Sequence, residues 1–241
     1  MALANLKKDT SVEADGDSVG GGGVLPSAVY LMTIVAAYFG ESTGGAASLN
    51  LELKTKEGKT LRNTVYISSS RAKGQSITYQ GKDGKPHFLP GFSLATSLTE
   101  LLLGTEIADV ATAEKQISLY NYLAKKEEET KVNMLVDLLD KQIAVGVIEC
   151  RSNKNTKNAA GAYAPDPSGA DRTYNEIDKF FNASGLTITE QLANAAKPGF
   201  LNTWKDKWDG NKRDDYVTPV ANGTAGAPVA SEPENTAQLF T

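Results

Sequence analysis

The chain has one cysteine, Cys150, and one histidine, His87, among its 241 residues. A single cysteine excludes an internal disulfide and is compatible with a reducing compartment such as the cytoplasm. Because there is only one residue of each kind, a zinc site built from Cys and His is excluded, and a histidine-based catalytic triad is improbable. The acidic residues include no ExxH spacing. We therefore expect a protein that is not an enzyme and that needs no cofactor or metal.

Long apolar runs are also missing. No stretch approaches the roughly 20 apolar residues of a membrane-spanning helix. The most apolar stretch, residues 24–39, is interrupted by Pro26, Ser27 and Thr33, and we interpret it as a buried strand. Residues 1–10 lack an apolar segment followed by a cleavage site, so we expect no signal peptide. The sequence therefore predicts no membrane association.

Apolar residues are sparse at both ends of the chain. Residues 1–23 combine scattered acids with a run of four glycines, and residues 211–241 are rich in Ala, Gly, Pro, Asn and Ser. Such segments cannot bury enough apolar surface to fold alone. The sequence predicts a disordered N-terminal arm (1–23), one folded domain (24–210) and a disordered C-terminal tail (211–241).

The first half of the domain shows strand patterns. Leucine alternates with polar residues over 47–54, and 61–68 alternates again after the turn at 56–59. On the second of these strands we expect Arg62, Thr64, Tyr66 and Ser68 to point outward, and on the first Ser48, Asn50 and Lys54. A smaller hairpin is predicted from 77–79 and 87–89.

The second half mixes helices and strands. We expect helices at 93–103, 133–140, 189–196 and 199–208, strands at 117–123, 141–151 and 174–182, and a polar loop at 152–170. Trp204 and Trp208 lie four residues apart, as in a buried helical stripe. The sequence predicts a mainly β protein with added helices (α+β), built on an OB-type five-stranded β-barrel core. Sandwiches and SH3-like barrels share parts of this order.

Charge is distributed unevenly along the chain. The net charge is −4, yet residues 54–85 contain eight basic and two acidic residues, a local charge of +6. The basic residues are Lys54, Lys56, Lys59, Arg62, Arg71, Lys73, Lys82 and Lys85, and Tyr66 and Tyr79 lie among them. Cations that replace phosphate counterions, together with flat rings on which unpaired bases stack, are typical of single-stranded DNA binding. The alternative is a pair of solvated hairpins with ordinary surface lysines.

A second basic stretch contains Arg151, Lys154 and Lys157, followed by Tyr163, with no acid between 151 and 165. A long loop between two barrel strands is where OB proteins hold their ligand, so these residues are further DNA-binding candidates. The alternative is a plain surface loop. Two glycine- or serine-rich segments, 20–23 and 68–74, lack the spacing of nucleotide-binding loops.

The C-terminal segment carries Glu232 and Glu234 and then the apolar pair Leu239 and Phe240. An apolar pair in an otherwise polar tail is typical of a segment that binds a partner protein. We therefore expect Leu239 and Phe240 to contact a partner, with an arbitrary terminus as the alternative.

Several stretches resemble a known family. They are Ala-Val-Tyr-Leu-Met at 28–32, Leu-Asn-Leu-Glu-Leu at 49–53, Ala-Lys-Gly at 72–74 with Tyr79, Phe-Leu-Pro-Gly at 88–91 and Glu-Ile-Asp-Lys-Phe-Phe at 176–181. Over residues 24–210 the chain is similar to the single-stranded DNA-binding proteins of lytic tailed bacteriophages, especially podoviruses. The resemblance implies an OB-type core and a role in phage DNA replication and recombination, in the cytoplasm of the infected bacterium. In some relatives it implies a role in transcription through RNA polymerase.

These observations lead to one expected function and two alternatives. We expect sequence-independent binding of single-stranded DNA, which coats and protects the strand, with phage replication proteins or RNA polymerase contacted through the tail. The first alternative is a single-stranded-DNA-binding transcription regulator that recruits an RNA polymerase to phage promoters. The second is a carboxylate-dependent nuclease. The sequence leaves open whether the protein forms a homo-oligomer, and it sets neither site size nor base preference.

Overall fold

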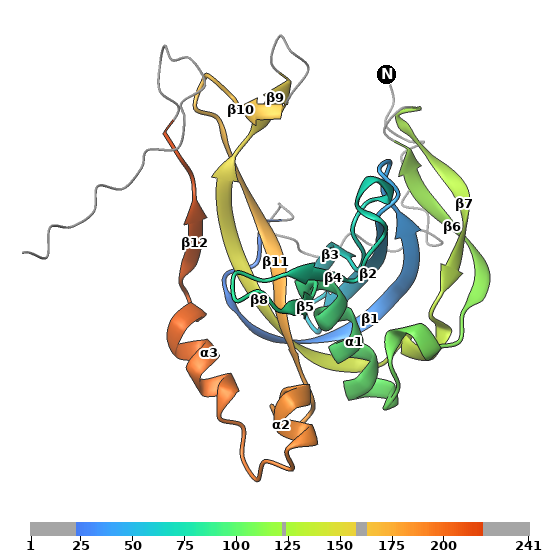
Figure 1. The fold of residues 1–241 in the computed structure, drawn as a ribbon, viewed down its shortest axis with the longest axis vertical. Helices are drawn as coiled ribbons and strands as arrows, with labels where there is room; N and C mark the ends of the chain where they lie inside the picture. The colour runs from blue at the N-terminus through green and yellow to red at the C-terminus, as the bar shows by residue number, and fades with distance from the viewer. Residues whose placement is uncertain (1–22, 122–123, 158–162, 219–241) are drawn as a thin grey trace, which may run out of the picture.

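The computed structural model describes residues 23–121, 124–157 and 163–218, and these form a mainly β structure with a few helices (Figure 1). The strands are β1 (Ala28–Glu41), β2 (Ala47–Thr55), β3 (Thr60–Tyr66), β4 (Thr78–Gln80), β5 (Pro86–Phe88), β6 (Ala113–Asn121), β7 (Lys126–Met134), β8 (Gln142–Asn153), β9 (Asn155–Lys157), β10 (Tyr163–Pro165), β11 (Asp171–Phe181) and β12 (Lys212–Asp215). The α-helices are α1 (Pro90–Leu103), α2 (Ile188–Leu192) and α3 (Phe200–Trp208), and short 3-10 turns lie at η2 (Arg71–Lys73), η3 (Ile107–Asp109) and η4 (Val136–Leu138).

The main sheet has the strand order β11-β8-β1-β2-β3. The long strand β1 joins two parts of the sheet, because its first half pairs with β8 and its last residues pair with β7. Between these two parts, the register of the β1–β2 pairing shifts between Ile34 and Ala36. β6 extends the sheet beyond β7, and β12 runs parallel to the outer half of β8. In Figure 1 the β6–β7 and β9–β10 hairpins rise on opposite sides of the same end of the molecule.

The main core lies between one face of this sheet and α1. The alternation in β2 buries Leu49, Leu51 and Leu53, and α1 contributes Ala95 and Leu98. Helix α1 ends at Gly104, whose φ of 70° is the left-handed conformation that glycine adopts readily. The helix begins so close to β3 that a Cβ at Gly91 would lie 2.1 Å from the Tyr66 carbonyl oxygen. Glycine at position 91 therefore allows α1 to pack against the end of β3.

A second cluster lies on the other face of β8 and β11, under α3. It consists of Ile148, Cys150, Phe181 and Trp204, with Trp208 partly buried against it. Trp204 Nε1 donates a hydrogen bond of 2.7 Å to Asp178 Oδ2, which satisfies the one polar group of the buried ring. The interpretation as a buried stripe is confirmed for Trp204, whereas Trp208 is only partly buried.

The predicted class, mainly β with added helices, is confirmed, and most predicted elements are present with shifted ends. Some predictions are wrong. The expected helix at 133–140 is the end of β7 followed by the short η4 turn, and the polar loop 152–170 contains β9 and β10. The sequence did not predict β7 because only Val132 and Met134, at its end, are buried, so most of the strand shows no hydrophobic alternation.

The predicted tail also begins too early. Lys212–Asp215 forms β12, and the structure describes the chain as far as Thr218, whereas the rest of the predicted tail and residues 1–22 lie outside the described residues. β12 is held mainly by charged side chains, so it lacks the apolar pattern that would have predicted a strand.

Among the described strands, β3 and β11 end the sheet order without pairing to each other, so these strands do not form a closed barrel. Within the described part of the chain, no helix is long and apolar enough to cross a membrane.

Candidate nucleic-acid interface

The face of β1, β2 and β3 that points away from α1 carries the predicted outward residues. The antiparallel register places Tyr66 opposite Ser48, Thr64 opposite Asn50 and Arg62 opposite Glu52. Tyr66, the last residue of the edge strand β3, is 53% exposed on this face, although a tyrosine usually buries most of its ring. The ring is therefore accessible to a ligand that lies across the strands.

Two of the predicted outward residues are buried. Ser48, the register partner of Tyr66, is buried. Ser68 is also buried, and its hydroxyl oxygen accepts a hydrogen bond of 2.9 Å from Ala47 N. The prediction from alternation was wrong for Ser68 because β3 ends at Tyr66, so Ser68 is not part of the strand. Gly40 lies in the same region, where a Cβ would meet Asn50 Nδ2 at 2.5 Å.

The polar groups of this face are linked to one another. Arg62 Nε donates to Glu52 Oε2 at 2.8 Å, yet the arginine side chain is 77% exposed. Thr64 Oγ1 donates to Asn50 Oδ1 at 2.8 Å. Tyr38 lies beside Asn50, and partial burial together with the Glu52 charge raises the pKa of its hydroxyl. The face thus presents two cations, Lys54 and Arg62, and one free ring, while Asn50, Glu52 and Thr64 are already hydrogen-bonded.

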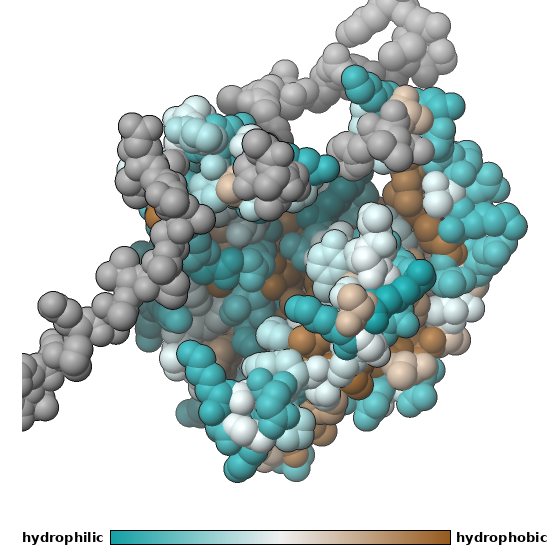
Figure 2. All heavy atoms as spheres, turned by 45° about the horizontal axis from the view of Figure 1, so that its top comes forward, coloured by the Kyte–Doolittle hydropathy of each residue, from teal (hydrophilic) through white to brown (hydrophobic). Residues whose placement is uncertain are grey.

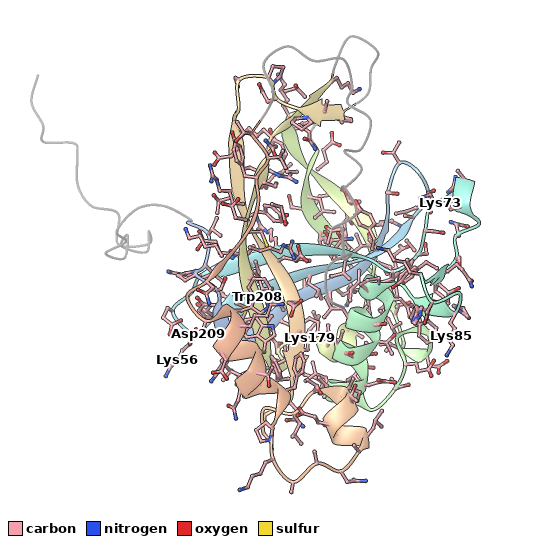
Figure 3. All side chains as sticks on the ribbon, turned by 60° about the vertical axis from the view of Figure 1, so that its left-hand side comes forward. Lys56, Lys73, Lys85, Lys179, Trp208 and Asp209 are labelled. Atoms are coloured by element: carbon pink, nitrogen blue, oxygen red, sulfur yellow. The ribbon has the colours of Figure 1, made fainter. Side chains whose placement is uncertain are left out.

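The basic residues of 54–85 do not form one cluster. Lys54, Lys56 and Lys59 surround the β2–β3 turn, whereas Arg71, Lys73, Lys82 and Lys85 lie in the segment that follows β3. Figure 3 shows Lys56 on one side of the molecule and Lys73 and Lys85 on the other. β3 connects the two groups, and its seven residues span about 20 Å. The cations therefore form two groups, one near each end of β3; we call β3 together with these two groups, Arg62 and Tyr66 the β3 track.

The segment after β3 also presents aromatic rings. Tyr79 is 47% exposed, with its ring centroid 5.8 Å from that of His87. His87 Nε2 lies 3.0 Å from Asp83 Oδ1, and this contact lowers the pKa of the Asp83 carboxyl group. Phe88 is 57% exposed and packs on Phe92 of α1. The three-residue strand β5 was too short for alternation to show which way Phe88 points.

Arg71 differs from the neighbouring lysines. Its guanidinium forms an ion pair with Glu41, and its side chain lies over Gly45, where a Cβ would be only 2.3 Å from Arg71 Cγ. Arg71 therefore fastens this segment to the β1–β2 turn. Lys73, Lys82 and Lys85 are exposed, and none forms an ion pair with a described residue.

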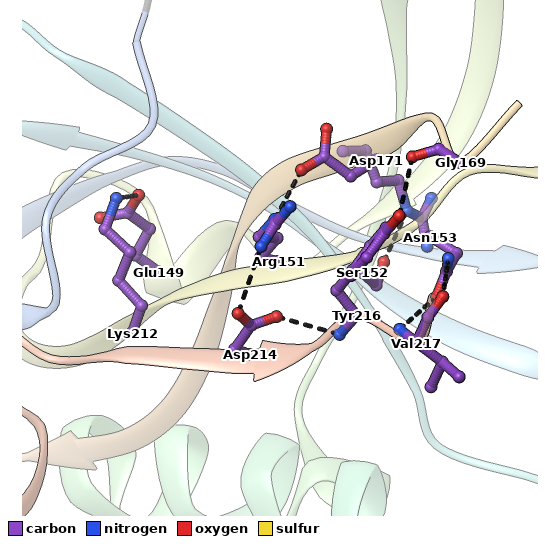
Figure 4. A network of polar contacts seen from close by, with 11 residues as sticks. Glu149, Arg151, Ser152, Asn153, Gly169, Asp171, Lys212, Asp214, Tyr216 and Val217 are labelled. Atoms are coloured by element: carbon purple, nitrogen blue, oxygen red, sulfur yellow. Dashed lines mark hydrogen bonds and ion pairs between the residues drawn. The ribbon is translucent and has the colours of Figure 1, made fainter. Parts of the chain in front are cut away.

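The second basic stretch lies on the region that we call the wing, formed by the outer halves of β8 and β11 together with β9, β10 and β12. Here Arg151 is engaged (Figure 4): its guanidinium bonds Asp171 at 2.5 Å and Asp214 at 3.4 Å and lies 4.4 Å from the Tyr216 ring centroid. Lys154 and Lys157 are exposed, and Lys157 Nζ lies 5.5 Å from the centroid of Tyr163, which is 70% exposed. On the wing, Lys154, Lys157 and the Tyr163 ring are therefore accessible to a ligand, whereas Arg151 links β8 to Asp171 and Asp214.

The same network ties the end of the described chain to the wing. Asn153 Nδ2 donates to Val217 O at 2.7 Å and Asn153 Oδ1 accepts from Val217 N at 2.9 Å, while Tyr216 donates to Gly169 O. These partners are 47 and 64 residues apart in the sequence, so no local pattern could have revealed them. Arg172 lies over the Tyr174 ring at 5.0 Å on β11, a pair that the sequence prediction also missed.

Figure 2 shows the molecule hollowed between the wing and the side that carries β6 and β7, with hydrophilic residues around the hollow. The pKa of Arg62 is raised mainly by its hydrogen bond to Glu52, and Glu127 of β7 adds a smaller contribution. In the described part of the chain, no group of three or more His, Cys, Asp or Glu side chains could hold a metal ion. Leu239 and Phe240 lie outside the described residues.

Comparison of the chain with protein-family models gives no match, and comparison with curated proteins gives none either.

Proposed function

We propose that this protein binds single-stranded DNA without strong sequence preference, coating and protecting exposed strands, and that it has no catalytic activity. The observation that carries the proposal is the exposure of Tyr66 and Arg62 on one sheet face, between lysines at both ends of β3. An extended strand that follows β3 would place phosphates near these lysines and one base on the Tyr66 ring.

Two properties of the face favour single strands and a weak sequence preference. A base can stack on Tyr66 only if its own face is free, which is not the case inside a duplex. The hydrogen-bonding groups beside the ring, Asn50 and Thr64, are bonded to each other and are therefore poorly placed to read base edges.

The biological setting rests on the resemblance to the phage proteins. On this basis we propose a role in phage DNA replication and recombination in the host cytoplasm. The tail residues Leu239 and Phe240 would contact replication proteins or RNA polymerase.

The decisive experiment is a gel-shift titration with single- and double-stranded oligonucleotides of one sequence, with and without Mg²⁺. We expect tighter binding to the single strand, no cleavage, and affinity that falls with salt by a log–log slope of about −0.7 for each neutralised phosphate. Equal affinity for the duplex would refute the proposal, and Mg²⁺-dependent cleavage would favour a nuclease.

A further inference from the structure

Two large aliphatic side chains of β1 are exposed on the sheet face that carries Tyr66. Leu31 is 59% exposed, and because it precedes the buried Met32 it points away from the core. Val35 is 46% exposed and reaches the same face through the shift in the β1–β2 register, where Val35 and Ala36 together oppose one residue of β2. We call Leu31 and Val35 the β1 patch.

Helix α3 covers the neighbouring part of this face but leaves the β1 patch open. Val29 and Ala144 are partly buried against the cluster under α3, and Ala144 is the β8 partner of Leu31. The end of α3 is fixed beside the start of β1, because Gly210 N donates to Ser27 O at 2.9 Å. The patch therefore lies between the edge of this cover and strand β2.

The β2 side of the patch is basic. Lys54 lies opposite Thr33 of β1, and Lys56 follows the last residue of β2. Both lysines are exposed, and neither forms an ion pair with a described residue. Glu52 is the acid on this side, and it is already bonded to Arg62.

The charges on the other borders of the patch balance one another. Lys141 accepts a backbone hydrogen bond from β1, and its neighbour in the chain is the exposed Asp140. The exposed charges at the end of α3 are two of each sign, namely Lys205, Asp206, Lys207 and Asp209. The uncompensated charge beside the patch therefore comes from the two lysines on the β2 side, which belong to the β3 track.

The size of the patch and its position suit a nucleic-acid base better than a second protein. A stable protein interface covers about 800 Å² on each partner, and two aliphatic side chains supply only a small part of such an area. Along β2, Lys54 is six residues from Ser48, the register partner of Tyr66, which corresponds to about 20 Å. A single strand that stacks on Tyr66 and follows the β3 track therefore reaches the patch after several nucleotides.

We propose that the β1 patch is a second base-binding position for the single strand that stacks on Tyr66. Lys54 and Lys56 hold phosphates, and one or two bases lie against Leu31 and Val35. Apolar contact with the face of a base does not depend on which base it is, so the second position preserves a weak sequence preference. This inference rests on the proposed function and extends it, because it sets the length of strand that fills the face.

The first test measures the affinity of the full-length protein for fluorescein-labelled oligothymidylates of about 3 to about 16 nucleotides, a range that brackets the site sizes of such surfaces. Leu31→Ser should weaken binding of the longer strands about fivefold, as expected when part of one leucine side chain is buried. The shortest strand occupies one position at a time and should lose less than twofold. Leu192→Ser makes the same change at a 72% exposed position of α2 and should bind every length like the wild type.

The second test separates base contact from phosphate contact. Two long oligothymidylates carry abasic residues, one in the 5′ half and one in the 3′ half. For one of them Leu31→Ser should have no further effect while Tyr66→Ala still weakens binding, and for the other the effects of the two variants should be exchanged. Val35→Ser should follow Leu31→Ser in both cases.

Two results would overturn the inference. The first is that Leu31→Ser and Leu192→Ser bind alike at every length. The second is that sedimentation shows a DNA-free dimer that Leu31→Ser dissociates, which would make the occupant a second copy of the chain. If the wild-type protein binds no oligonucleotide of any length, the proposed function itself is wrong. Binding by the wild type without a difference between the two leucine variants contradicts this inference alone.

Discussion

The β3 track and the wing are both rich in basic residues, but they use them differently. Along the track the lysines are exposed without an ion-pair partner among the described residues, and Arg62 has one carboxylate partner. On the wing, Arg151 and Arg213 each bond two carboxylates, and Lys212 bonds Glu149 at 2.5 Å. The track keeps its charge available to a ligand, whereas much of the wing's charge holds β12 against β8.

This difference shows that a count of basic residues is a poor guide to a binding surface. A guanidinium that is already bonded to two carboxylates must lose those contacts before it can bind a phosphate. An exposed lysine loses only solvent and side-chain freedom. We therefore expect substitutions on the wing to change stability and substitutions along the track to change DNA affinity.

The largest effect should follow from Trp204→Ala, which empties the cluster between α3 and the wing. Loss of a buried tryptophan costs about 3–5 kcal/mol of unfolding free energy. Urea denaturation would measure this loss. DNA affinity, measured where the variant is still folded, should remain near the wild-type value. A parallel loss of affinity would mean that the wing and the track are not separate.

On the track, Tyr66→Ala should weaken single-stranded DNA binding by about 1–3 kcal/mol, the contribution of one stacked base. The unfolding midpoint should hardly change, because the ring is 53% exposed. Tyr66→Phe keeps the ring and is the matched control, and it should retain most of the affinity. If the two variants bind equally weakly, the hydroxyl group and not stacking carries the contact.

A smaller effect distinguishes free from engaged cations. Lys73→Ala should reduce the magnitude of the log–log salt slope by about 0.7, the effect of losing one phosphate contact. Arg151→Ala should leave the slope unchanged and lower the melting temperature, since Asp171 and Asp214 lose their shared partner. Lys157→Ala tests the tip of the wing, and a slope change there would extend the DNA path onto β9.

The smallest effect concerns Cys150, which is fully buried in the wing and whose pKa is raised to about 11 by burial. Thiol reagents attack the thiolate, so labelling at pH 8 requires the wing to open. Saturating single-stranded DNA should leave the labelling rate unchanged. Arg213→Ala removes a contact of β12 and should accelerate labelling, which shows that the assay reports opening. Faster labelling with DNA would show that the ligand acts on the wing.

Much of the track could be predicted from the sequence because strands with one buried face show it by alternation. Leu49, Leu51 and Leu53 identified the buried face of β2, and the exposure of Arg62 and Tyr66 followed. The sequence could not tell that Lys56 and Lys85 lie on different sides, because that depends on where β3 carries the chain. Nor could it tell that Arg71 and Arg151 are engaged, since their partners are 30 and 20 or more residues away.

The wing was harder to predict for a physical reason. β12 and the β9–β10 hairpin are held by polar contacts and bury little apolar surface, so no hydrophobic period marks them. A charged strand such as β12 has little tendency to form by itself and is stabilised by its backbone pairing with β8. Tyr216 was missed because its contacts with Arg151 and Gly169 join residues far apart in the sequence.

The double pairing of β1 has a consequence for the order of folding. Residues 47–66 can complete the β1–β2–β3 hairpins with nearby contacts, whereas Met32 and Ile143, partners in the β1–β8 ladder, are more than 100 residues apart. Closing so long a loop is entropically costly and slow. During synthesis, one edge of β1 therefore stays unpaired until β8 has been made. Over this interval the hydrophobic residues of the first half of β1 are open to other chains, and fast production of the protein should favour aggregation through this edge.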